Sequence, residues 1–262
     1  MRNAGIHKIA HTIKIDSCLP KNNKNMNKPF KFKDFSVNQD KCAMKIGTDS
    51  VLLGAWTSIK NNPFSVLDIG SGTGVLSLMI AQRSTSETIE ALEIDADAYE
   101  QCSENFENSP WADRLFCYHA SLLEFVEETE DEYDLIICNP PFYSEDYKTN
   151  DKARDLARFS DAMPFEHLIY AVARLLSGNG MFSVVIPFKE EERFITLASK
   201  VGLFPNRILH IKGHPDAEIK RSLLEFSFKE SKIETSKLII ETERHKYTED
   251  YINLTKYFYL KM

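Results

Sequence analysis

Four consecutive residues after a predicted strand combine groups suited to one kind of chemistry, namely Asn139, Pro140, Pro141 and Phe142. The apolar residues 135–138 before them predict a buried strand. Each proline fixes its own φ and restrains the residue before it to an extended backbone, so the turn is stiff. Such a turn holds an amide oxygen, backbone carbonyls and an aromatic face in positions that suit a planar substrate bearing an NH2 group. A rigid strand exit with a buried Phe142 is the alternative that these residues leave open.

A glycine-rich loop upstream of this turn predicts a ligand site. Gly70, Gly72 and Gly74 follow an apolar stretch that contains Asp68. Glycines let the backbone turn tightly and come close to a ligand at the N-terminus of the next helix. A dinucleotide fingerprint is G-x-G-x-x-G, whereas here the third glycine comes one residue early and an acid precedes the first. This pattern favours a cationic, phosphate-free ligand such as S-adenosylmethionine over a pyrophosphate, with a purely structural turn as the alternative.

A second acid is a candidate for the same ligand. Glu93 ends the next predicted strand, near the spacing from the loop at which an acid meets ribose hydroxyls. Asp95 is close enough to be the rival candidate. A surface carboxylate without a ligand role is the alternative for Glu93.

Alternating short apolar runs and helical periods predict the elements that must position these residues. We expect strands at 65–69, 88–93, 114–119, 133–138 and 180–187, with helices at 73–84, 96–108, 121–127 and 164–177 between them. Repeated strand–helix alternation predicts a parallel sheet with helices on both faces. Ligands of such sheets bind beyond the carboxyl ends of the strands, where the glycine loop is predicted to lie.

The C-terminal third departs from this alternation. After a helix near 189–200, strands at 203–212 and 219–228 are joined by a connection too short for a crossover, which predicts an antiparallel pair. A strand at 237–241 and a helix near 248–259 complete the chain.

The segment before the alternating region predicts a hairpin within residues 30–46, followed by a helix capped by Thr48 or Asp49. Residues 1–29 predict a flexible extension because they are polar and low in complexity near their end. We therefore expect a single α/β domain over residues 30–262 after this extension.

Charge and cysteine content limit the class of protein. The chain has a net charge of −7, yet residues 1–45 hold ten Lys or Arg against three Asp. This asymmetry predicts a positive arm on an acidic body, with a solvated tail as the alternative.

No apolar stretch approaches the roughly 18 residues of a membrane span, and the first thirty residues lack the apolar region of a secretory signal. The five cysteines have no C-x-x-C spacing, which predicts reduced thiols in the cytoplasm and no metal site.

Four further blocks carry a resemblance to a known family: FSVNQDKCAMKIGTD at 35–49, LLGAW at 52–56, NSPWA at 108–112 and FYL at 258–260. With both motifs, the chain resembles the class I S-adenosylmethionine-dependent methyltransferases over about residues 30–262. It is most similar to the bacterial tRNA (adenine-N6)-methyltransferases that act on the adenosine next to the anticodon of valine tRNA.

The resemblance implies a Rossmann-like methyltransferase sheet, S-adenosylmethionine as cofactor, and N6-methylation of an anticodon-loop adenosine. The amine would be held by Asn139 and Pro140 beside the cofactor, with Pro141 completing the turn and Phe142 stacking on the base. The implied cofactor residues are Lys45, Gly47, Thr48, Asp68, Gly70, Gly72, Gly74, Glu93 and Asn139. Relatives often carry an acid after the third strand for the adenine amine, where this chain has Ser121 as a weaker hydrogen-bonding candidate.

The tRNA backbone would be contacted by basic residues, for which we expect Lys31, Lys33, Lys41 and Arg158. We expect a monomer. Two alternatives stay open: the same chemistry on DNA adenine or on a protein glutamine amide, and a catalytically silent protein that binds cofactor and RNA. The block at 38–49 and the absence of an added DNA-recognition domain favour RNA. The intact turn at 139–142 argues against a silent protein.

Overall fold

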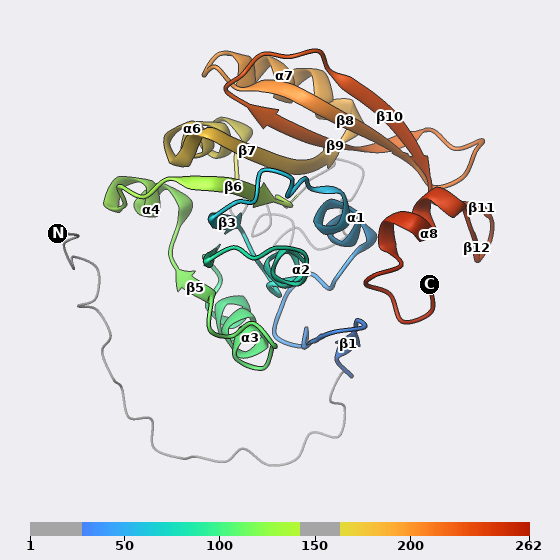
Figure 1. Cartoon of the computed structure of the whole chain (residues 1–262), viewed down its shortest axis with the longest axis horizontal. Coiled ribbons are helices and arrows are strands. Elements are labelled where there is room, and N and C mark those ends of the chain that lie inside the picture. The colour runs from blue at the N-terminus through green and yellow to red at the C-terminus, as the bar shows by residue number, and fades with distance from the viewer. Residues whose placement is uncertain (1–27, 142–162) are drawn as a thin grey trace, which may run out of the picture.

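The computed structural model describes residues 28–141 and 163–262, so most of the predicted extension lies outside the described residues. Its centre is an eight-stranded sheet with the strand order β10-β8-β9-β7-β6-β3-β4-β5 (Figure 1). The strands of this sheet are β3 (Ser65–Ile69), β4 (Thr88–Glu93), β5 (Leu115–His119), β6 (Tyr133–Cys138), β7 (Leu176–Pro187), β8 (Phe204–Lys212), β9 (Ile219–Ser227) and β10 (Glu234–Ile239). Two short antiparallel pairs stand apart from it, β1 (Phe30–Lys31) with β2 (Ser36–Val37), and β11 (Glu241–Glu243) with β12 (Lys246–Tyr247).

Most neighbours in the sheet are parallel, as the strand–helix alternation predicts. β3 pairs in parallel with β4 and with β6, and β6 pairs in parallel with β7. β9 runs antiparallel to both β7 and β8, which confirms the predicted antiparallel pair near the C-terminus. The predicted fold class, an α/β fold built on a mostly parallel sheet, is therefore confirmed.

Helices cover both faces of the sheet. They are α1 (Thr48–Trp56), α2 (Val75–Arg83), α3 (Ala96–Glu107), α4 (Leu122–Glu128), α6 (Phe165–Leu175), α7 (Glu191–Ser199) and α8 (Glu249–Thr255). Buried side chains of α1, α2, α3 and α8 share one core with one face of the sheet, and those of α4, α6 and α7 share a second core with the other face. Because both faces are covered, residues 135–138 of β6 are all fully buried, which explains the continuous apolar run.

Several predicted boundaries differ from the observed ones where the local pattern is weak. β7 begins at Leu176 instead of residue 180, and β10 begins at Glu234 instead of residue 237. β10 is an edge strand with four exposed residues at its start, so no apolar alternation marks them. Helix α8 ends at Thr255, because the chain turns there and Phe32 forms an antiparallel bridge with Tyr259.

The predicted cap of α1 is wrong. The helix begins at Thr48 with Gly47 in the N-cap position, and no side chain caps it. The Asp49 carboxylate is held instead by Arg221 on β9, whose Nε lies 2.8 Å from Asp49 Oδ2. A tertiary ion pair therefore takes the carboxylate that the local pattern assigned to capping.

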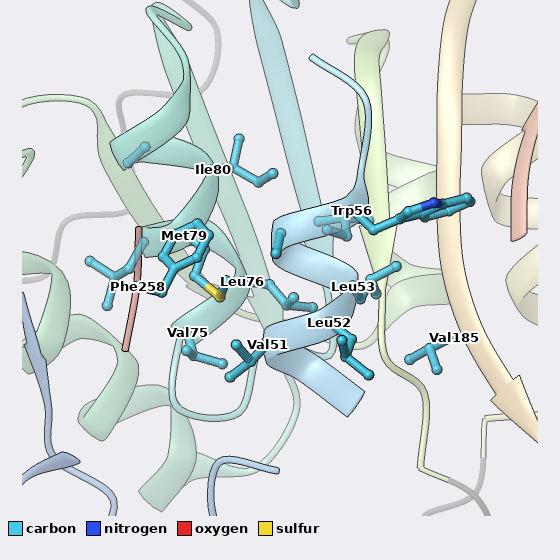
Figure 2. Packing of buried hydrophobic residues seen from close by; sticks show 14 of the residues in the cluster. Val51, Leu52, Leu53, Trp56, Val75, Leu76, Met79, Ile80, Val185 and Phe258 are labelled. Carbon is cyan, nitrogen blue, oxygen red and sulfur yellow. The ribbon is translucent and has the colours of Figure 1, made fainter. Parts of the chain in front are cut away.

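Helix α1 packs closely against α2 in the first core (Figure 2). Val51 and Leu53 on α1 are at most 1% exposed, and Met79 on α2 is fully buried. Gly54 permits this approach, because a Cβ there would lie 2.7 Å from Met79 Sδ and 3.1 Å from Met79 Cβ. The contact fixes α1 against α2 and so sets where the first turn of α1 lies.

Replacing Gly54 by alanine should therefore destabilise the fold. We expect Gly54→Ala to lower the free energy of unfolding by about 1–3 kcal/mol, the range typical of overpacking a closed core. Urea denaturation measures this change. Gly178→Ala is the control, since a Cβ there meets nothing within 4 Å. Equal stability of the two variants would contradict a close contact between α1 and α2.

Candidate active site

Three strands end side by side at the carboxyl edge of the sheet. Ile69 at the end of β3 pairs with Leu92 in β4 on one side and with Cys138 in β6 on the other. The glycine loop (residues 70–74) and Asn139 follow directly after β3 and β6. The structure thus brings the two predicted motifs to one edge, where open α/β sheets bind their ligands.

The glycine loop turns through the left-handed region. Gly70, Gly72 and Gly74 have φ angles of 70°, 54° and 76°. A Cβ at Gly74 would lie 2.5 Å from the Phe106 ring, so this glycine is required for packing against α3. A Cβ at Gly70 or Gly72 would meet nothing within 4 Å. These two glycines therefore leave open space in which a ligand can approach the backbone.

Asp68 lies buried beneath this loop. Its Oδ2 accepts hydrogen bonds from Ser77 N at 3.2 Å and Ser77 Oγ at 2.8 Å. Its Oδ1 is buried and has no hydrogen-bond partner among the described residues. Burial raises the pKa of Asp68 to about 7, because the charged form loses its hydration. An unpartnered carboxylate oxygen on the strand that leads into the glycine loop fits a ligand that carries positive charge, as S-adenosylmethionine does.

Glu93 is held rigidly at the end of β4. Its Oε2 accepts from Gly72 N at 2.7 Å, and its Oε1 accepts from Ile94 N and Asp95 N at 2.9 Å each. The rival candidate Asp95 uses its side chain to cap α3, accepting from Ala98 N at 2.8 Å. The carboxylate of Glu93 therefore borders the glycine loop directly, whereas that of Asp95 serves a helix end.

Two buried amides of α3, which the sequence analysis missed, fasten the segment before α1 to the glycine loop. Asn105 Nδ2 donates to Asn38 O and to Thr73 O at 2.9 Å each, and its Oδ1 accepts from Asn38 N at 2.8 Å. Gln101 Oε1 accepts from Lys41 N at 2.9 Å. Both amides are 1% exposed. The available signal was helical spacing, because Gln101 and Asn105 occupy the same stripe of α3 as its buried apolar residues.

The predicted cofactor residues upstream of the sheet follow this fastened segment. Lys45, Gly47 and Thr48 are exposed and run into the first turn of α1. Ile46 N donates to Gln39 Oε1 at 3.0 Å, so the two ends of the segment from Gln39 to Ile46 are hydrogen-bonded to each other. A role for these three residues against the cofactor stays a prediction.

Asn139 emerges half-buried from β6 and contacts the first turn of α1. Its Nδ2 donates to Ser50 Oγ at 2.8 Å. Pro140 is buried and Pro141 is half-buried, whereas Phe142 lies outside the described residues. The carboxamide of Asn139 is thus tied to α1 through its nitrogen.

Two of the predicted phosphate contacts are engaged within the chain. Lys33 Nζ donates to the backbone oxygens of Lys256 and Met262 near the C-terminus. Lys41 Nζ lies 2.7 Å from Glu104 and 3.3 Å from Glu100 on α3. These pairings support the fold, and the predicted RNA contacts of both residues stay predictions.

Lys31 lies in β1. The position of the segment that follows β1 is set by a hydrogen bond between Asp34 and the end of α2. Asp34 Oδ2 accepts from Gln82 Nε2 at 2.6 Å, at the last turn of α2. Since α2 starts at the glycine loop, this turn lies roughly 12 Å along the helix from the loop. Arg158 lies outside the described residues.

Ser121 has a role within the protein. Its Oγ accepts from Glu124 N at 3.3 Å and its backbone N donates to Glu124 Oε2 at 3.4 Å, which forms a capping box at the start of α4. Its Oγ also donates to Glu124 Oε2 at 2.7 Å. A contact with the adenine of the cofactor stays a prediction for this residue.

Residues 28–141 and 163–262 contain neither a candidate membrane span nor a candidate metal centre. No helix in these ranges is long and apolar enough to cross a membrane. Within the same ranges, no group of three His, Cys, Asp or Glu side chains could hold a metal ion.

Comparison with known proteins shows that the similarity of this chain to methyltransferases extends over most of its length. Residues 45–195 match the family model of the methyltransferase small domain. The tRNA1(Val) (adenine(37)-N6)-methyltransferase of Flavobacterium psychrophilum is 66% identical over 233 residues, covering 89% of this chain and 100% of that protein. The enzyme of the same name from Bacteroides fragilis is 44% identical over 239 residues, covering 90% of this chain and 100% of its own.

Among solved structures, a predicted O-methyltransferase from Agrobacterium tumefaciens superimposes with a TM-score of 0.61 at 20% identity. The match covers 80% of this chain and 96% of that one, and at this identity it establishes the fold alone. The identity to the curated relatives and their full coverage establish more: this chain belongs to the tRNA1(Val) (adenine(37)-N6)-methyltransferase family.

Proposed function

We propose that this protein transfers a methyl group from S-adenosylmethionine to the N6 amine of adenosine 37 in a valine tRNA. The observation that carries the proposal is the position of Asn139 beside the glycine loop, in a chain 66% identical to a relative with this activity in its name. When bound, S-adenosylmethionine supplies a methyl group activated by its sulfonium. The protein must then hold the cofactor, orient the amine and exclude other acceptors.

The cofactor side of the proposal rests on two carboxylates and the loop between them. Asp68 Oδ1, buried and unpartnered among the described residues, would accept from or neutralise the cationic part of the ligand. Glu93, already fixed by three backbone amides, would accept from the ribose hydroxyls. Gly70 and Gly72 would let the ligand lie against the backbone. Residues 45–48 would cover it from the side of α1.

The substrate side rests on the turn at 139–141. An exocyclic adenine amine is a poor nucleophile because its lone pair is delocalised into the ring. Hydrogen bonds from this amine to Asn139 Oδ1 and to the Pro140 carbonyl would favour a pyramidal nitrogen with its lone pair directed at the methyl group. Orientation of this kind supplies much of the barrier reduction in bimolecular transfers. Phe142, outside the described residues, would stack on the base, a contact worth about 1–3 kcal/mol.

An anticodon-loop base suits this geometry. A base must leave its stack before its amine can reach such a turn, and loops offer unstacked bases at low cost. Cys138 is completely buried, and burial raises the pKa of its thiol well above the ordinary value, which argues against a reactive thiolate at this position. We propose that the amine attacks the methyl group directly: its new bond to the methyl carbon forms as the bond from that carbon to the sulfonium breaks, and the amine then loses a proton.

Finer parts of the proposal concern RNA contacts, oligomeric state and location. Lys31, Lys33, Lys41 and Arg158 are the proposed phosphate contacts, although Lys33 and Lys41 would have to exchange their present partners for phosphate. We further propose a monomer that acts in the cytoplasm. The described cysteines support this location, since all four are free thiols.

The substrate is tested by a transfer assay with labelled S-adenosylmethionine. We expect incorporation into unmodified valine tRNA and none into duplex DNA or a release-factor protein, because the family likeness extends over nearly the whole chain. A tRNA carrying guanosine at position 37 is the control and should accept no label. Transfer to the protein but not the tRNA would overturn the proposed substrate, and transfer to none of them would favour the catalytically silent alternative.

Removal of the amine acceptor should separate chemistry from cofactor binding. We expect Asn139→Ala to lower kcat about 100-fold or more, the scale seen when one preorganised hydrogen-bonding group is removed from a transition state. Calorimetry should find the affinity for S-adenosylmethionine within threefold of the wild-type value. A collapse of cofactor affinity would instead assign Asn139 to holding the cofactor or the fold, and not to the chemistry on the amine.

Asp68 should make cofactor affinity depend on pH. Its pKa of about 7 in the folded protein means that the free protein holds the proton below pH 7. A cationic ligand favours the carboxylate, so affinity should rise as the pH is raised from 6 to 8. Asp68→Asn should bind more weakly and lose this rise, whereas the exposed control Asp113→Asn should keep it. Calorimetry across this range measures both, and an unchanged pH profile in Asp68→Asn would contradict the proposed contact.

The raised pKa of Asp68 also makes the stability of the folded protein depend on pH. Since the folded pKa of Asp68 lies above its ordinary value of 3.8, the stability of the ligand-free protein should fall as the pH rises from about 4 to 7. In Asp68→Asn this fall should be smaller, which urea denaturation at several pH values measures.

A further inference from the structure

An exposed aromatic ring follows β7, the strand beside the one that leads to Asn139 (Figure 1). In the parallel pair of β6 and β7, Cys138 lies opposite Val184. Asn139 follows Cys138 by one residue, whereas Phe188 follows Val184 by four. The difference of three residues is roughly 10 Å of extended chain. Phe188 therefore lies past the turn at 139–141 on the neighbouring strand, and it is 39% exposed.

Contacts through α1 and β9 tie this ring to the turn. Asn139 Nδ2 donates to Ser50 Oγ at 2.8 Å, in the first turn of α1. Asp49, next to Ser50, accepts from Arg221 Nε at 2.8 Å. Arg221 lies opposite Pro187, the residue before the ring, in the antiparallel pair of β9 and β7. Packed elements therefore set the position of the ring relative to the turn.

The ring also has a firm support on the protein side. Phe188 packs against His210 with a centroid distance of 5.1 Å and an interplanar angle of 83°. His210 Nε2 lies 2.9 Å from Glu191 Oε2 at the start of α7, and Ser222 Oγ donates to the same carboxylate oxygen. Because its support is hydrogen-bonded to two elements, the ring presents a fixed apolar surface to solvent.

A cation accompanies the ring. Lys189 follows it directly and is exposed. The two acids that come next are engaged within the protein, Glu190 with Arg193 at 3.5 Å and Glu191 with the histidine beneath the ring. An aromatic side chain beside a cation is the combination that binds single-stranded nucleic acid, since the ring stacks on a base and the cation contacts the backbone.

We propose that Phe188 is a stacking platform for the base of a nucleotide that flanks the target adenosine in the tRNA loop, with Lys189 contacting the phosphate backbone beside it. The inference rests on the proposed function, because it takes Asn139 to mark the position of the target amine. An adenosine that leaves its stack to reach the turn deprives its neighbours of a stacking partner. A fixed ring beside the turn replaces that partner, and it can do so for any base because every base has a π face.

The first test measures binding of an unmodified anticodon stem-loop of valine tRNA. Phe188→Ala should weaken binding about tenfold, as for loss of one stack between a base and an aromatic ring. Phe188→Tyr keeps the ring and should bind within twofold of wild type. Phe188→Leu keeps an apolar cover over His210 without a ring, and it should bind as weakly as Phe188→Ala. Affinity near the wild-type value in Phe188→Leu would overturn the proposal.

Kinetics distinguish a substrate contact from damage to the reacting centre. In Phe188→Ala the KM for the stem-loop should rise about tenfold in parallel with the loss of binding. The kcat and the affinity for S-adenosylmethionine should stay within twofold of wild type, because the ring contacts neither the amine nor the cofactor. A fall in kcat with an unchanged KM would contradict a flanking-base contact.

Stem-loops with one abasic nucleotide identify the base. With the abasic site on the correct side of adenosine 37, 5′ or 3′, the wild-type protein should bind about tenfold more weakly than to the intact loop. In Phe188→Ala the same abasic site should cost twofold or less, since the ring on which the base stacks is already absent. Equal losses in both proteins at both positions would show that neither flanking base contacts Phe188.

Salt dependence tests the cation. Lys189→Ala should reduce the slope of log Kd against log salt concentration by about one, as for loss of one phosphate contact. Lys200→Ala is the matched control, because Lys200 is exposed at the far end of α7, and its slope should equal that of wild type. An unchanged slope in Lys189→Ala would overturn the phosphate contact.

The outcomes separate this inference from the proposed function. Methylation of the stem-loop by the wild-type protein, together with unchanged binding by Phe188→Ala, would overturn the inference and leave the function standing. Binding that depends on Phe188, without methylation of the stem-loop or of valine tRNA, would refute the proposed function while the RNA contact of the ring remains.

Discussion

The parallel register of β3 with β4 and β6 is the constraint on which the site depends. Because Ile69 pairs with both Leu92 and Cys138, the strands β3, β4 and β6 end at the same level along one edge of the sheet. Segments far apart in the sequence, the glycine loop and the Asn-Pro-Pro turn, become neighbours without any direct bond between them. The two cores on either face of the sheet hold this register by burying the apolar side chains of all three strands.

Several polar side chains near this edge are buried, which lowers stability unless they are hydrogen-bonded. Nearly all of them form hydrogen bonds with backbone groups. Glu93 takes three amides, and Asn105 makes three bonds to the backbone of Asn38 and Thr73. Asp68 is the exception, with one buried oxygen unpartnered among the described residues. A buried polar atom without a partner lowers stability, so this unpartnered oxygen is better explained by a ligand than by the fold alone.

Helix α1 contacts both α2, which follows the glycine loop, and Asn139, which follows β6. Its apolar side is seated on α2, where Gly54 permits contact with Met79, while its first turn reaches Arg221 of β9 and Asn139 after β6. The helix thus spans the end of β7, which lies between those two strands in the sheet. Packing in the core beneath α1 therefore sets the position of the polar groups at the edge above it.

Local patterns in the sequence determined the fold class, most of the strands and helices, and the two motifs, because apolar periodicity and glycine or proline chemistry act within a few neighbouring residues. They did not determine the exposed edge strand β10, whose start has no apolar pattern, or the partners of Lys33 and Lys41, which lie on the C-terminal segment and on α3. The bond between Asn139 and Ser50 joins residues 89 positions apart. Only the tertiary structure decided such pairings, since they depend on how packed elements set distant side chains against each other and leave no trace in the local sequence.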